Sequence, residues 1–280
     1  MTLNIKAYIK LSRPANLVLV GTVVLIASTL FPVYPSIWDV LLTIICSTFI
    51  TAAGNALNDM CDIEIDRINK PNRPLPSGKI SMKSAKSFMI TMFILGNIAG
   101  LILGFWSLVI SLLIATSLLF WYAYRLRHVA LVGNMVVAFL SALTFLFAAQ
   151  AFGDIKIGYV PFVLTFIISV IREVVKDLED LDGDKAHDSR TLPVVAGESP
   201  TRIIAAIIAA FFIPIVPIPY VSGMYGKWFF FLSMIGVVIP MVIITVQLFQ
   251  LRRTINYYQI AGVLKIVMFI GLAAVFLGRF

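Results

Sequence analysis

Long apolar stretches separated by short polar segments run through the whole chain. A helix needs about 20 apolar residues to cross a bilayer, and nine stretches approach or reach that length. They cover residues 15–32, 37–57, 86–104, 106–124, 130–152, 157–176, 202–222, 228–249 and 257–278. The boundary at Gly104-Phe105 is the weakest. The pattern predicts an all-α integral membrane protein with nine transmembrane helices in a single domain, residues 1–280.

The basic residues between these stretches predict which side of the membrane each connection occupies. Cytoplasmic connections carry an excess of Lys and Arg. With the N-terminus inside, 18 of the 22 basic residues fall on the cytoplasmic side, and the others are Lys156, Lys227, Lys265 and Arg279. Merging any two stretches would place a basic connection on the wrong side. We therefore expect a multi-pass protein of the cell membrane, with its N-terminus cytoplasmic and its C-terminus outside.

The composition excludes an ordinary soluble domain, because 60% of the residues are hydrophobic and only 13% are charged. No small-residue cleavage site follows the first apolar stretch, which predicts a retained span and not a signal peptide. Cys46 and Cys61 form no pair motif, and His128 and His187 are too few and too scattered for a zinc site. We expect contact with membrane lipids, no nucleic acid and no obligate protein partner.

The acidic residues are concentrated in two segments, 59–66 and 173–188, which hold 11 of the 14. Both contain the spacing D-x2-D-x3-D at the end of an apolar stretch: Asp59, Asp62 and Asp66, then Asp177, Asp180 and Asp184. At about 100° per helical residue, the carboxylates of each motif share one face, whereas Glu64 points elsewhere. Like charges on one face destabilise a helix. Magnesium prefers such hard oxygen ligands together with a substrate phosphate. Either segment alone is also compatible with a solvated helix end, but the repetition favours a Mg²⁺ site.

Each acidic segment continues into a cytoplasmic loop, at about 58–85 and 177–201, and we expect both loops to form the active site. Metal-bound carboxylates beside lysine and arginine are suited to a diphosphate. The candidate diphosphate ligands are Lys70, Arg73, Lys185 and Arg190. The alternative is that such bases only set topology and contact lipid headgroups. We favour that alternative for Lys79, Lys83 and Lys86.

A diphosphate at the edge of an apolar bundle indicates a prenyl diphosphate whose tail lies between helices. Metal and bases would stabilise the leaving diphosphate as the allylic C–O bond breaks. Aromatic ring faces would stabilise the allylic cation, and the candidates are Phe120, Trp121, Tyr122 and Tyr124. The alternative for these rings is an aromatic belt at the membrane interface.

Taken together, these motifs resemble the UbiA superfamily of intramembrane prenyltransferases. The resemblance rests on N-D-x2-D-x3-D at 58–66, the loop N-K-P-N-R-P-L-P-S-G at 69–78, D-x3-D at 180–184 followed by Arg190-Thr191, and S-R-P-A-N at 12–16. It covers essentially the whole chain and implies a nine-helix ring around a central cavity, with two Mg²⁺ ions held between the Asp motifs. The implied metal ligands are Asn58, Asp59, Asp62, Asp66, Asp177, Asp180 and Asp184. Of these, Asp59, Asp62, Asp180 and Asp184 are the expected catalytic carboxylates.

Within that family, the first loop and the compact chain look most like the archaeal digeranylgeranylglyceryl phosphate synthases. This likeness implies transfer of a geranylgeranyl group from geranylgeranyl diphosphate to the glycerol hydroxyl of geranylgeranylglyceryl phosphate, which forms an ether of archaeal membrane lipids. A lipid-like acceptor that carries its own phosphate needs a basic pocket. The candidates for that pocket are Arg13, Asn16, Arg125 and Arg127.

Three alternatives stay open at the level of sequence. Prenyltransferases acting on aromatic or quinone precursors, chlorophyll or haem share the same motifs. A CDP-alcohol phosphotransferase is faintly suggested by D-G-D-K-A at 182–186, but the arginine of its motif and the downstream G-x3-D-x3-D are absent. A cation transporter would also use intramembrane carboxylates, although transport sites lie near the bilayer midplane, whereas both motifs here lie at one membrane edge.

Overall fold

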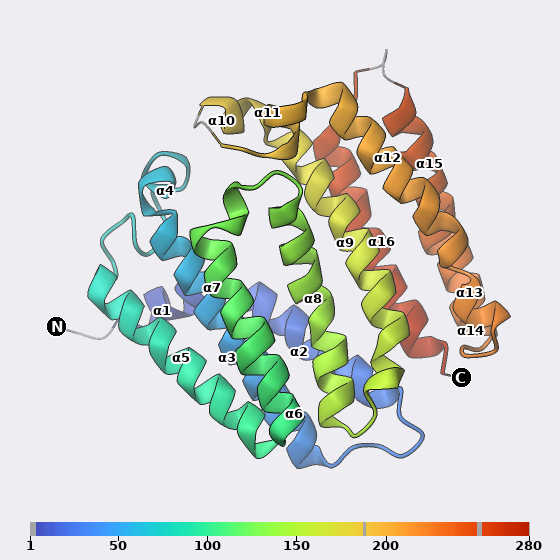
Figure 1. The fold of residues 1–280 in the computed structure, drawn as a ribbon, viewed down its shortest axis with the longest axis horizontal. Helices are drawn as coiled ribbons and strands as arrows, with labels where there is room; N and C mark the ends of the chain where they lie inside the picture. Colours follow the sequence, from blue (N-terminus) through green and yellow to red (C-terminus); the bar gives the residue numbers. More distant parts are fainter. Residues whose placement is uncertain (1–3, 187–188, 251–253, 280) are drawn as a thin grey trace. The chain divides into compact units, whose positions relative to one another are not determined.

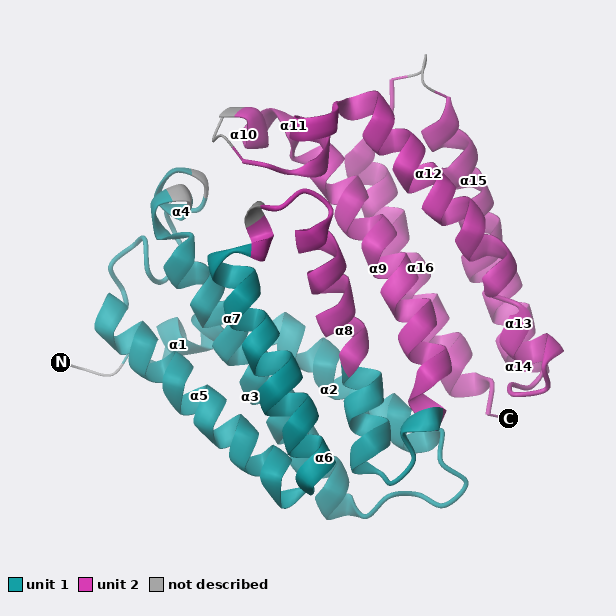
Figure 2. Ribbon diagram, in the orientation of Figure 1, with its two compact units in different colours: residues 1–125, 144–156 teal, residues 126–143, 157–280 magenta. Residues whose placement is uncertain are grey.

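The computed structural model describes residues 4–186, 189–250 and 254–279, and every regular element within them is helical (Figure 1). The chain forms two compact units (Figure 2). Unit 1 comprises residues 1–125 and 144–156, and unit 2 comprises residues 126–143 and 157–280. The helix α8 (Val132–Ala151) contributes its first part to unit 2 and its last part to unit 1.

Unit 1 is built around α3 (Ile37–Cys61), which packs against α2 (Pro14–Thr29), α5 (Met82–Ile102) and α7 (Ser117–Tyr124). Small residues let α3 and α5 approach closely, as in membrane helix pairs generally. A Cβ atom added at Gly96 of α5 would lie 2.9 Å from the Ile50 side chain and 3.3 Å from the Cys46 carbonyl oxygen, both on α3. The shorter elements of this unit are α1 (Ile5–Ser12), α4 (Ile63–Asn69), α6 (Phe105–Leu108) and the π-helix η1 (Val109–Thr116).

Unit 2 is organised by α9 (Tyr159–Glu179), which packs against α12 (Glu198–Ile215) and α16 (Tyr257–Leu277), while α12 also packs against α15 (Ile239–Phe249). Their shared core includes Ile171, Val174, Ala205, Met241 and Leu264. The remaining elements of this unit are η2 (Leu126–His128), α10 (Leu181–Ala186), α11 (Leu192–Ala196), α13 (Ile218–Val221), α14 (Lys227–Ser233) and the π-helix η4 (Met234–Val238). The short helix η3 (Ile155–Gly158) begins in unit 1 and ends in unit 2.

The spans agree with those predicted from the hydrophobic pattern. Among the described residues, eight helical segments are long and apolar enough to cross a membrane, and the bent pair α1 and α2, with an angle of 55° between them, makes up to nine. The weak boundary near Gly104 is real, because this residue has φ +123° and separates α5 from α6. The all-helical membrane fold is therefore confirmed, and the orientation, the central cavity and the single domain stay predictions.

Candidate metal and diphosphate site

The first acidic motif lies where α3 passes into α4. Asp62, with φ −96° and ψ 8°, ends one helix and precedes the next. The backbone hydrogen bonds nevertheless continue across this break, since Asp62 N donates to Asn58 O at 2.9 Å and Asp66 N donates to Asp62 O at 2.8 Å. The helical register of the motif is thus retained. Asp59 and Asp66 therefore face the same side, as the spacing predicts.

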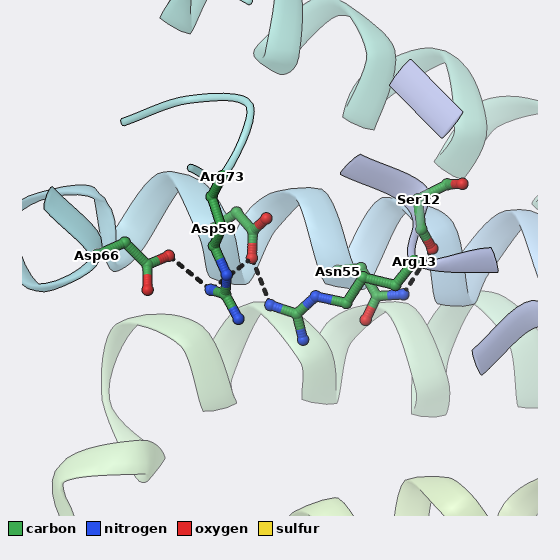
Figure 3. A network of polar contacts seen from close by, with 6 residues as sticks. All are labelled: Ser12, Arg13, Asn55, Asp59, Asp66 and Arg73. Atoms are coloured by element: carbon green, nitrogen blue, oxygen red, sulfur yellow. Dashed lines mark hydrogen bonds and ion pairs between the residues drawn. The ribbon is translucent and has the colours of Figure 1, made fainter. Parts of the chain in front are cut away.

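These two carboxylates share one guanidinium group (Figure 3). Nη1 of Arg73 donates to Asp66 Oδ2 at 2.5 Å and to Asp59 Oδ1 at 3.2 Å. Nη2 of Arg13 donates to the same Asp59 oxygen. The side chains of Asp59 and Asp66 are only 3% and 5% exposed, whereas those of Arg13 and Arg73 are 32% and 22% exposed. Two buried anions are thus paired with two cations that keep access to solvent.

Arg13 reaches this site from the sharp turn between α1 and α2. It has φ +55°, a left-handed conformation that is uncommon for a residue other than glycine. Its N–H bonds Lys10 O and so caps α1, while Pro14 begins α2. The Asn55 side chain fixes the turn to α3 by donating to Ser12 O at 2.9 Å. Strained backbone held by such contacts is a feature of functional sites.

Arg73 is held by a folded loop between α4 and α5. Leu75 and Ile80 anchor this loop with side chains that are each 5% exposed. Ile80 N donates to Pro74 O at 3.2 Å, and Ser77 N donates to Arg73 O at 3.0 Å. The loop therefore presents the Arg73 guanidinium toward α3 and α4 as a defined structure.

The second acidic motif, at the end of α9, has neutral partners. Asp177 Oδ2 accepts a 2.8 Å hydrogen bond from Asn134 of α8, and Asp184 Oδ2 accepts one of 2.9 Å from the Thr191 hydroxyl. Burial raises the pKa of Asp184; the Thr191 hydroxyl lowers it and the charge of Asp180 raises it. In the part of the chain that the structure describes, no ion pair involves Asp177, Asp180 or Asp184. Asn134 lies outside every motif noted in the sequence, and no local signal marks it.

The other predicted site residues lie mostly at the surface. The side chains of Asn16, Lys70, Arg125, Lys185 and Arg190 are exposed, and those of Asn58, Asp62 and Arg127 are intermediate. On α7, Tyr122 is half-buried, whereas Trp121 and Tyr124 are 68% and 61% exposed. The exposure of these two rings favours the interface-belt alternative for them.

Glu64 was expected to point away from the first motif, and the structure agrees. It is exposed and pairs with Arg67 at 2.8 Å, one turn along α4.

The role predicted for Arg13 was acceptor binding. Its contact with Asp59 places it beside the first motif, and the acceptor role stays a prediction.

The donor set fits magnesium in its chemistry. Among the described residues, no three His, Cys, Asp or Glu side chains lie close enough together to hold a metal ion. The first motif nevertheless brings Asp59 and Asp66 around one cationic group, the Arg73 guanidinium. Two carboxylates that already share a guanidinium group can also share a metal ion, because either cation places positive charge between the carboxylate oxygens.

Known proteins resemble this chain in sequence and in fold. The profile of the UbiA prenyltransferase family matches residues 17–276. Relatives named digeranylgeranylglyceryl phosphate synthase include that of Sulfolobus acidocaldarius, 34% identical over 281 residues, and that of Methanobrevibacter smithii, 30% identical over 280 residues, each match covering 98% of both chains.

Solved structures agree with the sequence matches. A structure concerning digeranylgeranylglyceryl phosphate synthase in membranes is 31% identical, with a TM-score of 0.83 over 98% of both chains. A UbiA homolog from Archaeoglobus fulgidus bound to GPP and Mg²⁺ shares the fold, with a TM-score of 0.73 at 17% identity over 96% of this chain and 98% of the other. The chain thus belongs to the UbiA prenyltransferase family and is a prenyltransferase of the membrane.

Proposed function

We propose that this enzyme transfers a geranylgeranyl group from geranylgeranyl diphosphate to the glycerol hydroxyl of geranylgeranylglyceryl phosphate, with Mg²⁺ as cofactor. One observation carries the proposal: relatives that carry the name of this synthase match along 98% of the chain at 30–34% identity. The place of action is the cytoplasmic edge of the cell membrane, which the distribution of basic residues supports.

The carboxylates of both motifs are the proposed metal ligands, with Asn58 beside them. These residues would hold magnesium, which would supply the positive charge that stabilises a leaving diphosphate. Within unit 1, Arg73 pairs with Asp59 and Asp66, and this proximity supports the proposal that its guanidinium binds diphosphate oxygens next to those carboxylates. Lys70, Lys185 and Arg190 are the further proposed diphosphate ligands. Their exposed side chains are accessible to a substrate that arrives from the cytoplasm.

The acceptor hydroxyl attacks the allylic carbon with a lone pair and loses a proton as the ether bond forms. A motif carboxylate or a diphosphate oxygen is the proposed proton acceptor. The phosphate of the acceptor is proposed to bind Arg125 and Arg127, with Asn16. Such a site favours a phosphorylated acceptor over a neutral one, because guanidinium groups bind phosphate with charge-assisted hydrogen bonds.

The test is product analysis with purified protein in detergent. Geranylgeranyl diphosphate, Mg²⁺ and geranylgeranylglyceryl phosphate should give the ether phosphate, identified by its mass, together with released diphosphate. The same ether without its phosphate should be a much poorer acceptor, and 4-hydroxybenzoate should not be prenylated. Efficient prenylation of the aromatic acid, with none of the glyceryl phosphate, would reject this acceptor while leaving prenyl transfer intact.

A further inference from the structure

The contacts of the first acidic motif suggest how its metal binding is controlled. We propose that Arg13 and Arg73 form an arginine latch on Asp59 and Asp66, so that this motif binds a divalent cation tightly only when a diphosphate draws the guanidinium groups away. The inference rests on the proposed function, since it takes the diphosphate donor from there. It concerns the positioning of charge in unit 1 alone.

One oxygen of each buried carboxylate is already engaged by an arginine. Asp59 Oδ1 accepts hydrogen bonds from both arginines, and Asp66 Oδ2 accepts one from Arg73. A carboxylate oxygen has about two lone-pair sites, so both sites of Asp59 Oδ1 are engaged by N–H donors. A divalent cation at this oxygen must displace a guanidinium group. Before that displacement, the cation is repelled by the two guanidinium groups, and burial weakens the screening of this repulsion by solvent.

Burial decides which partner moves. The carboxylates of Asp59 and Asp66 are fixed at the α3–α4 junction with 3% and 5% of their side chains exposed. The arginine side chains are several times more exposed, and Arg73 belongs to a loop. A diphosphate arriving from solvent therefore meets the guanidinium groups first. Guanidinium binds phosphate oxygens through paired, charge-assisted hydrogen bonds, which frees the carboxylates for the metal.

Such an exchange makes metal and diphosphate bind cooperatively. If the diphosphate raises the affinity of the motif for metal, the metal raises the affinity for diphosphate by the same factor. The chain offers a matched control within α4. Arg67 pairs with exposed Glu64 at 2.9 Å and 2.8 Å, so it carries the same charge near the motif without touching Asp59 or Asp66.

The test measures metal binding in the absence of diphosphate. Full-length protein in detergent is titrated with Mn²⁺, and free Mn²⁺ is read by electron paramagnetic resonance. Arg13→Gln and Arg73→Gln should each bind Mn²⁺ about tenfold more tightly than wild type, since the metal no longer displaces a charge-assisted hydrogen bond. Arg67→Gln should leave the affinity unchanged. Adding Asp59→Asn to Arg73→Gln should abolish the gain.

Thermal unfolding of the same samples keeps the test decisive if a variant is less stable. Arg73→Gln removes the arginine that pairs with Asp66 and leaves Asp59 with Arg13. The melting temperature of this variant should therefore fall, and Mn²⁺ should raise it more than it raises that of wild type. Unchanged or weaker Mn²⁺ affinity in folded Arg13→Gln and Arg73→Gln overturns the latch. An equal gain in Arg67→Gln also overturns it, because a general field would then explain the result.

The outcomes separate this inference from the proposed function. Mn²⁺ binding requires no acceptor, so the latch stands if affinity rises as expected while no prenyl group is transferred to glyceryl phosphate ethers. Conversely, transfer by wild type together with unchanged Mn²⁺ affinity in the variants rejects the latch alone.

Discussion

Asn134 is the most informative residue to change, because it touches the second motif from a different helix. Its Nδ2 donates to Asp177 Oδ2 at 2.8 Å. Asn134→Leu keeps a similar volume and removes this hydrogen bond. A hydrogen bond to a charged group contributes about 1.5–3 kcal/mol, which corresponds to about 10–100-fold in an equilibrium constant. The partners that orient metal ligands typically contribute a similar factor to metal affinity.

The assay is the Mg²⁺ concentration that gives half-maximal prenyl transfer. Asn134→Leu should raise it by about 10–100-fold, and excess Mg²⁺ should restore much of the rate. Ser141→Ala is the control on the same helix, since its hydroxyl bonds the Val137 carbonyl at 2.9 Å. If Asn134→Leu left the Mg²⁺ requirement unchanged and raised the KM for the acceptor, Asn134 would not act through Asp177.

Three further changes test the site. Asp62→Ala should lower transfer by about 10²-fold or more, while Glu64→Ala, on the exposed face, should change it little; equal losses measured in initial rates would refute the assignment of faces. Burial disfavours the charged form of Asp184 and raises its pKa. In metal-free buffer the melting temperature of wild type should therefore fall as pH rises through that pKa, and it should fall less in Asp184→Asn. An equal pH dependence of the melting temperature in the two proteins would contradict this. Leu75→Ala should loosen the loop that holds Arg73, because Leu75 is buried. The KM for the donor should rise more than kcat falls, and a change in kcat alone would show that the loop does not position the guanidinium.

Local patterns were sufficient to predict the membrane-spanning helices and the shared face of Asp59 and Asp66. Asp59 and Asp66 are seven residues apart, which is about two helical turns, and Arg73 bridges them. The break at Asp62 was not foreseen. It does not alter the face, because the hydrogen bonds between residues four apart continue through it. Helical register is a local property, and the spacing of residues along the chain captures it.

The π-helices were also not predicted from the sequence, although the hydroxyl contacts of η1 agree with them. Thr116 Oγ1 donates to Ser111 O at 2.8 Å and Ser117 Oγ donates to Leu112 O at 3.1 Å, each five residues earlier. This is the spacing of π-helical hydrogen bonds. An apolar pattern cannot distinguish it from α-helical spacing over so few residues, because both geometries keep the span apolar on all sides.

The partners of the carboxylates depend on tertiary packing, and this limits what spacing can reveal. Asp59 is paired across 46 positions with Arg13, and Asp177 is paired across 43 positions with Asn134. The two motifs share the pattern D-x2-D-x3-D, which alone would predict equal roles. In the described structure the first motif is paired with arginine cations and the second with neutral donors. Under the proposed metal role, a cation would compete with guanidinium groups at the first motif, whereas at the second it would meet carboxylates that neutral hydrogen-bond donors orient. Spacing predicts which carboxylates share a helical face, whereas the residues packed against them, which spacing does not reveal, determine how each carboxylate is paired.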